Sequence, residues 1–301
     1  MNNKICLDKN YSTTRSLTKE KLEVARNTEE KFESILFLPE DNGRKGGGGL
    51  RVQGYFKESY DNRPLISIIT VVYNGEGFLE ETIQSVISQT YDNVEYILID
   101  GGSTDETVNI IKKYENRIDY WISEKDDGIY DAMNKGLVLA KGRYVYFMGS
   151  DDRLIKNSLT KIFNGILIKT DKLIALPVAI NNVTNLAYPA IEFPVSIVHH
   201  QGAIFNLLNL KQIGLYSNKY KFHSDFDLMC KYVSKYGVQY LDNPICIFRK
   251  GGASTSGANA IQSMKELLHI YFTNSGKILS TKWIMFIVRP IYYFACGIIR
   301  K

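Results

Sequence analysis

The sequence predicts an α/β fold: a Rossmann-like, mostly parallel sheet with flanking helices, followed by a mixed α+β half and C-terminal helices. Three observations predict the parallel sheet. Apolar runs rich in β-branched residues recur along residues 64–153, stretches with helical spacing separate them, and the runs end at glycines and carboxylates. Strands that alternate with helices at this spacing form βαβ units, and such units build parallel, doubly wound sheets.

The first strand and helix carry the clearest pattern. Residues 66–72 are nearly all apolar and β-branched, which is typical of a parallel strand buried on both faces. Gly75 and Gly77 end this strand, and residues 78–89 follow with helical spacing. The apolar stripe of that helix contains Phe78, Leu79, Ile83, Val86 and Ile87.

The remaining elements follow the same logic with weaker signals toward the C-terminus. In the α/β half we expect strands at 94–99, 118–122 and 144–148 and helices at 106–114 and 131–140. After residue 153 the alternation loosens to mixed α+β. There we expect helices at 157–168 and 224–236 and strands at 173–180, 198–205 and 238–248.

Two segments flank the predicted domain, which we place at residues 64–260. Residues 1–63 form a polar N-terminal extension, and its glycine run at 46–49 is expected to hold neither helix nor strand. The sequence favours a draped segment there, with a short strand or clamp at residues 50–56 as the alternative. Residues 261–301 form a helical tail that is basic and apolar.

The charge distribution separates the tail from the body. The net charge is +5, from 37 Lys+Arg against 32 Asp+Glu, and the surplus equals the five basic residues Lys277, Lys282, Arg289, Arg300 and Lys301. A neutral body argues against nucleic-acid binding, which needs a basic stripe on the fold. The tail fits peripheral contact with an anionic membrane, with a packed helix or a homodimer contact as alternatives.

Other bulk features indicate the compartment. The four cysteines share no close spacing, which predicts free thiols rather than a disulfide framework or a zinc knuckle. No secretory signal opens the chain, and no apolar run reaches the roughly 18 residues of a membrane-spanning helix. We therefore expect a cytoplasmic protein that associates peripherally with the inner face of the membrane.

Carboxylates follow the predicted strands, at the edge where parallel sheets bind ligands. The three strand ends are Tyr73-Asn74-Gly75-Glu76, Asp100-Gly101-Gly102-Ser103 and Ser150-Asp151-Asp152. Neither the Gly-x-Gly-x-x-Gly of dinucleotide-binding folds nor the Gly-Lys-Ser/Thr of a P-loop is present. Acidic side chains accommodate a phosphorylated ligand when Mg²⁺ or Mn²⁺ bridges the charges, so a divalent metal site is expected here. A solvated turn is the alternative.

Four motifs together resemble a known family. They are residues 64–74 (PLISIITVVYN), 99–105 (IDGGSTD), 123–136 (SEKDDGIYDAMNKG) and 150–152 (SDD). In this order and spacing they are similar to the inverting family 2 glycosyltransferases, which have the GT-A fold and use nucleotide-sugar donors. The resemblance covers residues 64–260. It implies metal-dependent transfer from a nucleotide-sugar, by family default a UDP-sugar, to a hydroxyl of a glycan or lipid-linked acceptor in bacterial cell-surface polysaccharide assembly, such as O-antigen or capsule.

The resemblance also implies roles for single residues. Donor-site residues would be Val71, Tyr73, Glu76, Asp100, Ser103, Asp131, Asn134 and Asp151. Asp100 would hydrogen-bond the nucleobase, Asp151 would reach the ribose or the donor sugar, and Asp152 would bind the metal. Turn and helix-capping roles are the alternatives for Asp100, Ser103, Asp131 and Asn134. Met133 stands where many relatives carry Arg, which puts that contact in doubt.

The expected base lies in the second half of the domain. The family places a catalytic carboxylate at a helix start, and Asp225 occupies that place, with Asp227 as competitor. A helix N-terminal acid without catalytic role is the alternative for either. His200 and Gln201 resemble an acceptor-side segment, and Ser224 stands where Glu is common. A nucleotide-sugar-binding protein without catalysis and a sugar nucleotidyltransferase stay as alternative functions.

Overall fold

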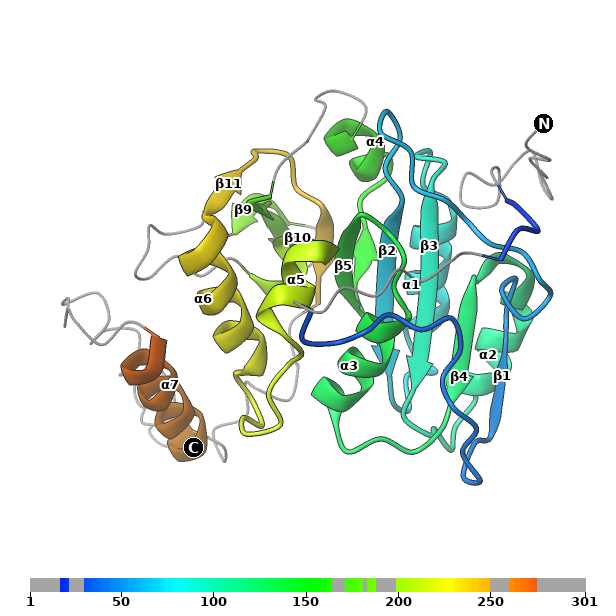
Figure 1. Ribbon diagram of the computed structural model, residues 1–301, viewed down its shortest axis with the longest axis horizontal. Coiled ribbons are helices and arrows are strands. Elements are labelled where there is room, and N and C mark those ends of the chain that lie inside the picture. Colours follow the sequence, from blue (N-terminus) through cyan, green and yellow to red (C-terminus); the bar gives the residue numbers. More distant parts are fainter. Residues whose placement is uncertain are drawn as a thin grey trace.

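The computed structural model describes residues 17–21, 30–163, 171–180, 183–187, 199–249 and 260–274. Within them, eight strands form a central sheet in the order β1-β4-β3-β2-β5-β10-β7-β11 (Figure 1). The parallel strands β4, β3, β2 and β5 lie side by side, and antiparallel β10 follows β5. The predicted α/β fold with a mostly parallel sheet is confirmed. The strands are β1 (Gly46–Gly48), β2 (Ile66–Val72), β3 (Val94–Asp100), β4 (Tyr120–Ser123), β5 (Tyr144–Gly149), β7 (Leu173–Ala175), β10 (Ala203–Asn206) and β11 (Val238–Tyr240).

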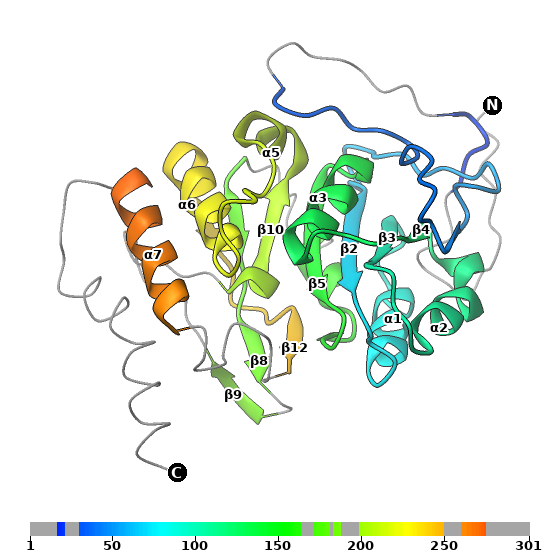
Figure 2. The ribbon, with the colours of Figure 1, turned by 90° about the horizontal axis from the view of Figure 1, so that it is seen from below.

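Helices cover both faces of this sheet (Figure 2). One face carries α1 (Leu79–Ile87), α2 (Thr107–Lys113) and α4 (Ser158–Phe163), whose apolar side chains pack in one core cluster. The other face carries α3 (Ile129–Leu139), α5 (Leu207–Ile213) and α6 (Ser224–Tyr236). Every residue of β2 and β3 is buried, which explains why both sequences are mostly apolar. Two 3₁₀ turns, η2 (Glu115–Arg117) and η3 (His200–Gly202), complete the connections.

A second, four-stranded sheet was not expected from the sequence. It has the order β6-β12-β8-β9, with β6 (Arg153–Leu154), β8 (Val178–Ile180), β9 (Val183–Ala187) and β12 (Cys246–Phe248). The strand predicted at 238–248 was wrong as one element, because β11 joins the central sheet and β12 joins the smaller one. Asp242-Asn243-Pro244 separates them, and these residues favour a turn.

The glycine run near the N-terminus also differs from the prediction. It was expected to form no strand, yet Gly46–Gly48 is the edge strand β1, antiparallel to β4. The reason is steric, since a Cβ at Gly48 would lie 2.7 Å from Nε1 of Trp121 and one at Gly46 would lie 3.0 Å from the same ring. Only glycine lets the strand lie against the indole. Gly49 then turns the chain with a φ of +101°.

Residues 50–57 clamp the core through two buried ion pairs. The Arg51 guanidinium pairs with Glu95, and Lys57 pairs with Asp119 at 2.9 Å. All four side chains are nearly inaccessible to solvent. Removing one partner of such a pair costs about 3–5 kcal/mol, because a buried charge is then left alone. The clamp that the sequence offered as the alternative for residues 50–56 is therefore what the structure contains.

Helix α7 (Ala260–Asn274) packs against α6 on the outer side of the molecule (Figure 1). No helix among the described residues is both long enough and apolar enough to span a membrane. The predicted basic apolar tail after residue 275 lies outside the described residues. Two of the four cysteines, Cys230 and Cys246, are described, and both are buried free thiols.

Candidate functional site

A cavity of about 470 Å³ opens at the carboxyl ends of β2 and β5. This edge is where ligands bind in parallel α/β sheets. Among the residues predicted for the donor site, Val71, Tyr73 and Asp151 line the cavity. The strand-end motifs and the resemblance also pointed to Val72, Asn74, Gly75 and Ser150. Sequence reasoning gave no site role to the other lining residues, which are Phe78, Asp126, Ile129 and Ala132. Most of them lie inside or next to the four motifs, so proximity to a motif was the available signal.

A polar network fixes the loop after β2 to the turn after β3. Asn74 has a φ of +49°, which its short polar side chain tolerates. Its N–H donates to Oγ of Ser103 at 2.8 Å, and its side-chain oxygen accepts from the N–H of Thr104 at 2.9 Å. Glu76 accepts from the N–H of Glu106 at 3.1 Å. Ser103 and Glu76 therefore hold two strand ends together beside the cavity.

Asp100 is the centre of that network. It is fully buried, and its carboxylate accepts from the N–H groups of Gly102 and Ser103 and from the hydroxyls of Ser103 and Ser123. Oδ2 accepts three of these hydrogen bonds and Oδ1 accepts one, from the Ser103 hydroxyl, so each oxygen is held in place. Asp100 thus organises the turn, and its contact with a nucleobase stays a prediction.

The two aspartates after β5 differ in placement. Asp151 lines the cavity, whereas Asp152 lies beneath it and is 1% exposed. Oδ1 of Asp152 accepts from the Arg249 N–H at 2.9 Å, and Oδ2 has no hydrogen-bond partner among the described residues. Burial raises the pKa of Asp152 to about 7, and the nearby Asp151 charge adds to this effect. A Cβ at Gly149 would lie 2.5 Å from Oδ2, so glycine is required at that position.

This pair fits a divalent cation. An unpartnered, buried carboxylate oxygen is the ligand type that Mg²⁺ and Mn²⁺ bind, and a cation would offset the burial of the Asp152 charge. Asp151 supplies a second carboxylate from the same loop. No group of three or more Asp, Glu, His or Cys side chains among the described residues is arranged to hold a metal ion. One or two carboxylates completed by phosphate oxygens and water are a ligand set that Mg²⁺ accepts.

Two predicted donor residues on α3 point elsewhere. The amide of Asn134 donates to the Tyr216 carbonyl at 3.0 Å and accepts from the Tyr216 N–H at 2.8 Å. Asp131 lies in the first turn of α3 and pairs with Lys135 at 3.5 Å. Neither residue lines the cavity, and their donor contacts stay predictions.

The expected base, Asp225, begins α6 on the side of the sheet that carries α3. Its Oδ1 accepts from the Tyr130 hydroxyl at 3.0 Å and from the Phe226 N–H at 2.8 Å. Its competitor Asp227 is 2% exposed and is engaged by Lys231 at 2.6 Å and Asn274 at 2.8 Å. Asp225 is therefore the accessible carboxylate of the two.

Three histidines lie within electrostatic range of Asp225. Burial lowers the pKa of His199 to about 4, and it also lowers the pKa of His200 and of His223, while the Asp225 charge opposes each shift. His200 is buried, and its Nε2 lies 2.9 Å from the Tyr216 hydroxyl. The main chain of its neighbour Gln201 accepts from Tyr146 at 2.8 Å. Near neutral pH the surroundings of Asp225 thus contain uncharged imidazoles.

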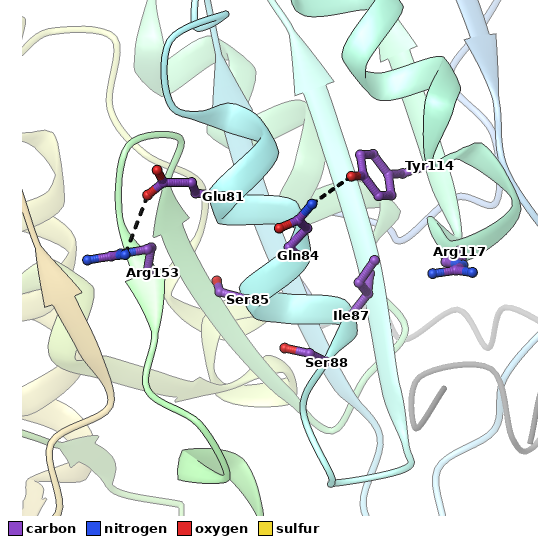
Figure 3. Close-up of a pocket in the computed structure, with 8 residues that line it drawn as sticks. All are labelled: Glu81, Gln84, Ser85, Ile87, Ser88, Tyr114, Arg117 and Arg153. Carbon is purple, nitrogen blue, oxygen red and sulfur yellow. Dashed lines mark hydrogen bonds and ion pairs between the residues drawn. The ribbon is translucent and has the colours of Figure 1, made fainter. Parts of the chain in front are cut away.

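A larger cavity of about 600 Å³ lies away from these residues, along α1 and α2 (Figure 3). None of the site residues predicted from the sequence lines it. On its wall, Glu81 pairs with Arg153 at 3.5 Å and also with Arg249 at 3.3 Å. Since Arg153 follows Asp152 in the chain and the Arg249 N–H binds Asp152, Glu81 connects α1 to the acidic loop.

Comparisons with known proteins show which family the chain belongs to and which structures share its fold. Residues 67–233, more than half of the chain, match the family model described as glycosyl transferase family 2. A putative teichuronic acid biosynthesis glycosyltransferase of Bacillus subtilis is 41% identical over 102 residues, 33% of this chain and 40% of the relative. Two solved structures share the fold at low identity. S. aureus TarS 1–349 in complex with UDP-GlcNAc has a TM-score of 0.56 and 18% identity, covering 76% of this chain and 72% of that one. A mannosyltransferase from Pyrobaculum calidifontis in complex with GDP-Man and Mn²⁺ has a TM-score of 0.57 and 17% identity, covering 77% and 70%.

Proposed function

Because the chain belongs to glycosyl transferase family 2 and is a glycosyltransferase, we propose that it moves a sugar from a UDP-sugar to a hydroxyl of a glycan or lipid-linked acceptor, with inversion at the anomeric carbon. The catalytic unit is residues 64–260. One observation carries the proposal: the first turns of α3 separate the acidic cavity from Asp225, since Ile129 and Ala132 line the cavity and Tyr130 binds Asp225. A donor bound in the cavity and an acceptor bound at Asp225 would therefore lie next to each other, on two sides of the start of α3.

Asp151 and Asp152 would hold a divalent cation in this proposal. The support is the unpartnered, buried Oδ2 of Asp152 and the Mn²⁺ in the Pyrobaculum calidifontis complex. The cation, when bound, neutralises charge on the diphosphate leaving group. Tyr73 and Val71 in the cavity wall offer a ring and an apolar surface to the nucleotide.

Asp225 acts as the general base. Its carboxylate takes the proton of the acceptor hydroxyl while that oxygen forms a bond to the anomeric carbon. The bond from that carbon to the diphosphate oxygen breaks, and its electron pair leaves with the nucleoside diphosphate. A single displacement from the opposite face inverts the configuration. In the proposal, His200 and Gln201 lie on the acceptor side of Asp225. Burial lowers the pKa of His200, so its uncharged imidazole forms no ion pair with the carboxylate.

The decisive experiment compares Asp225→Asn with Asp227→Asn in the full chain. A thermal-shift screen of nucleotide-sugars with Mn²⁺ first identifies the donor, since only ligands that bind the native state stabilise it. Asp225→Asn should then lose about 10²- to 10⁴-fold in transfer while the donor-induced shift persists. Asp227→Asn, which alters the neighbouring carboxylate, should keep most of its transfer activity. Transfer at the wild-type rate by Asp225→Asn would overturn the assignment.

The donor and the setting are finer parts of the proposal. The TarS complex with UDP-GlcNAc supports a UDP-sugar, and the GDP-Man complex makes guanosine donors the alternative that the screen distinguishes. The teichuronic acid relative supports a role in cell-surface polysaccharide assembly, with O-antigen and capsule among the settings.

We also propose that the basic apolar tail brings the enzyme to the inner face of the membrane, where a lipid-linked acceptor would lie. Its five cations and no acids after residue 275 support this. Truncation after Ser275 should release the protein from anionic liposomes in a sedimentation assay and preserve the donor-induced thermal shift. A truncated protein that still sediments with those liposomes would remove the tail as the anchor, and a change to a monomer would favour the homodimer contact.

A further inference from the structure

We propose that Tyr130 is the positioning residue of the base: its hydroxyl holds Oδ1 of Asp225 and leaves Oδ2 to receive the proton of the acceptor hydroxyl. This inference rests on the function proposed for Asp225. Tyr130 touches no reacting atom, so it acts through the orientation and the charge of that carboxylate.

The hydrogen bonds of Asp225 distinguish its two oxygens. Oδ1 accepts two hydrogen bonds, from the Tyr130 hydroxyl at 3.0 Å and from the Phe226 N–H at 2.8 Å. No hydrogen bond from a described residue reaches Oδ2. A carboxylate oxygen offers about two acceptor positions, so the hydrogen bonds from the described residues fill Oδ1 and leave Oδ2 able to accept. The protein thus presents one defined oxygen to the acceptor.

Packing fixes the Tyr130 ring. Tyr130 is buried and stacks on Tyr216, with ring centroids 5.7 Å apart and planes inclined by 22°. Asn134 holds the main chain of Tyr216 through two hydrogen bonds, and His200 binds its hydroxyl. Two residues predicted to bind substrate therefore support the ring that supports the base. A side chain locked in this way orients a reactive group without further ordering during the reaction.

The protonation states agree with this direction of donation. Burial and, next, the Asp225 charge raise the pKa of Tyr130 well above its ordinary value, so the phenol keeps its proton and donates it in the hydrogen bond. A donor aimed at a carboxylate stabilises the charged form. The other titratable groups that interact electrostatically with Asp225 come from the segments before and within α6 and from η3. They are His199, His200, Tyr216, His223 and Cys230.

The position of Tyr130 connects the two substrates. On α3 it lies between Ile129 and Ala132, which line the donor cavity. The helix that forms the cavity wall therefore also holds the base. This placement fixes the acceptor oxygen relative to the donor through a single rigid element, rather than through two halves that move independently.

The test uses Tyr130→Phe in the full chain, with Tyr232→Phe as the matched control. Tyr232 is fully buried on the same helix as Asp225, and its hydroxyl donates to the Asp171 carbonyl at 2.9 Å, away from the base. Both variants lose one buried phenol hydroxyl, and Tyr130→Phe keeps the ring that stacks on Tyr216. We expect Tyr130→Phe to lower kcat about 10- to 100-fold with an unchanged donor KM.

The outcomes separate this inference from the proposed function. If Asp225→Asn is inactive while Tyr130→Phe has wild-type kcat, Tyr130 is not the positioning residue and the function stands. If Tyr232→Phe shows the same loss of kcat at unchanged donor KM, the effect is one of general stability and the inference fails. If Asp225→Asn transfers normally, the proposed function of Asp225 is what fails.

Discussion

Asp152 and Asp225 lie in two halves of the molecule, and the two carboxylates differ in burial and in hydrogen bonding. The β2–β5 half buries Asp152 and leaves its Oδ2 without a partner among the described residues. The α6 half leaves Asp225 partly accessible and gives its Oδ1 two donors. An unpartnered, buried oxygen suits a cation that arrives with the substrate, whereas an oriented, accessible one suits proton transfer. Burial and hydrogen bonding therefore distinguish the two carboxylates where the residue type cannot.

The same contrast is visible in what holds each half together. Around the cavity, contacts run between strand ends, as when Ser103 accepts from the Asn74 N–H. The start of α6 is instead held from outside the sheet by α7. Glu266 on α7 is buried and accepts from the N–H groups of Lys221 at 3.0 Å and Phe222 at 2.9 Å, just before Asp225. Ser263 on the same helix contacts His223 at 2.6 Å.

The largest expected effect is a gain of stability in the β2–β5 half. The folded-state pKa of Asp152 is raised to about 7 by burial, so the protonated form is favoured and stability is lost as pH rises from about 4 through 7. In metal-free protein, Asp152→Asn should match the wild type near pH 4.5 and exceed it at pH 8, by up to about 4 kcal/mol. Denaturant melts across this pH range measure the difference.

Two controls sharpen that result. Asp151→Asn removes a charge that adds to the raised pKa of Asp152, so it should reduce the pH dependence of stability without abolishing it, because burial is the larger cause. Mn²⁺ should stabilise the wild type at pH 8 and should not stabilise Asp152→Asn, because the cation and the amide relieve the same buried charge. If wild type and Asp152→Asn have the same free energy of unfolding at pH 8, the buried charge of Asp152 does not destabilise the protein and the contrast with Asp225 is wrong.

The same difference decides what the sequence could predict. The bounds of β2 and α6 agree with the residues predicted. A strand buried on both faces gives a nearly continuous apolar run, and an amphipathic helix gives a periodic apolar pattern. β1 shows no such pattern, because its glycines are required by contact with the Trp121 ring, about 75 positions later in the chain. Tyr130 lay inside a recognised motif, but the pattern around it could not indicate that its hydroxyl reaches a carboxylate 95 residues away.

The smaller expected effect is a loss in the α6 half, produced by Glu266→Gln. Hydrogen bonds from Gln262, Phe222 and Lys221 outweigh the burial that would raise the pKa of Glu266, so this pKa lies below its ordinary value and the charged form is bound. A Gln side chain keeps one acceptor oxygen and turns an NH₂ toward a main-chain donor, which should cost about 1–3 kcal/mol of stability. Because those donors directly precede α6, kcat should fall while the donor-induced thermal shift stays. Gln262→Ala, which removes only a side-chain contact to Glu266 and leaves both main-chain bonds, should change stability by less than about 0.5 kcal/mol. A Glu266→Gln variant that loses donor binding together with kcat would mean that the two halves respond as one unit.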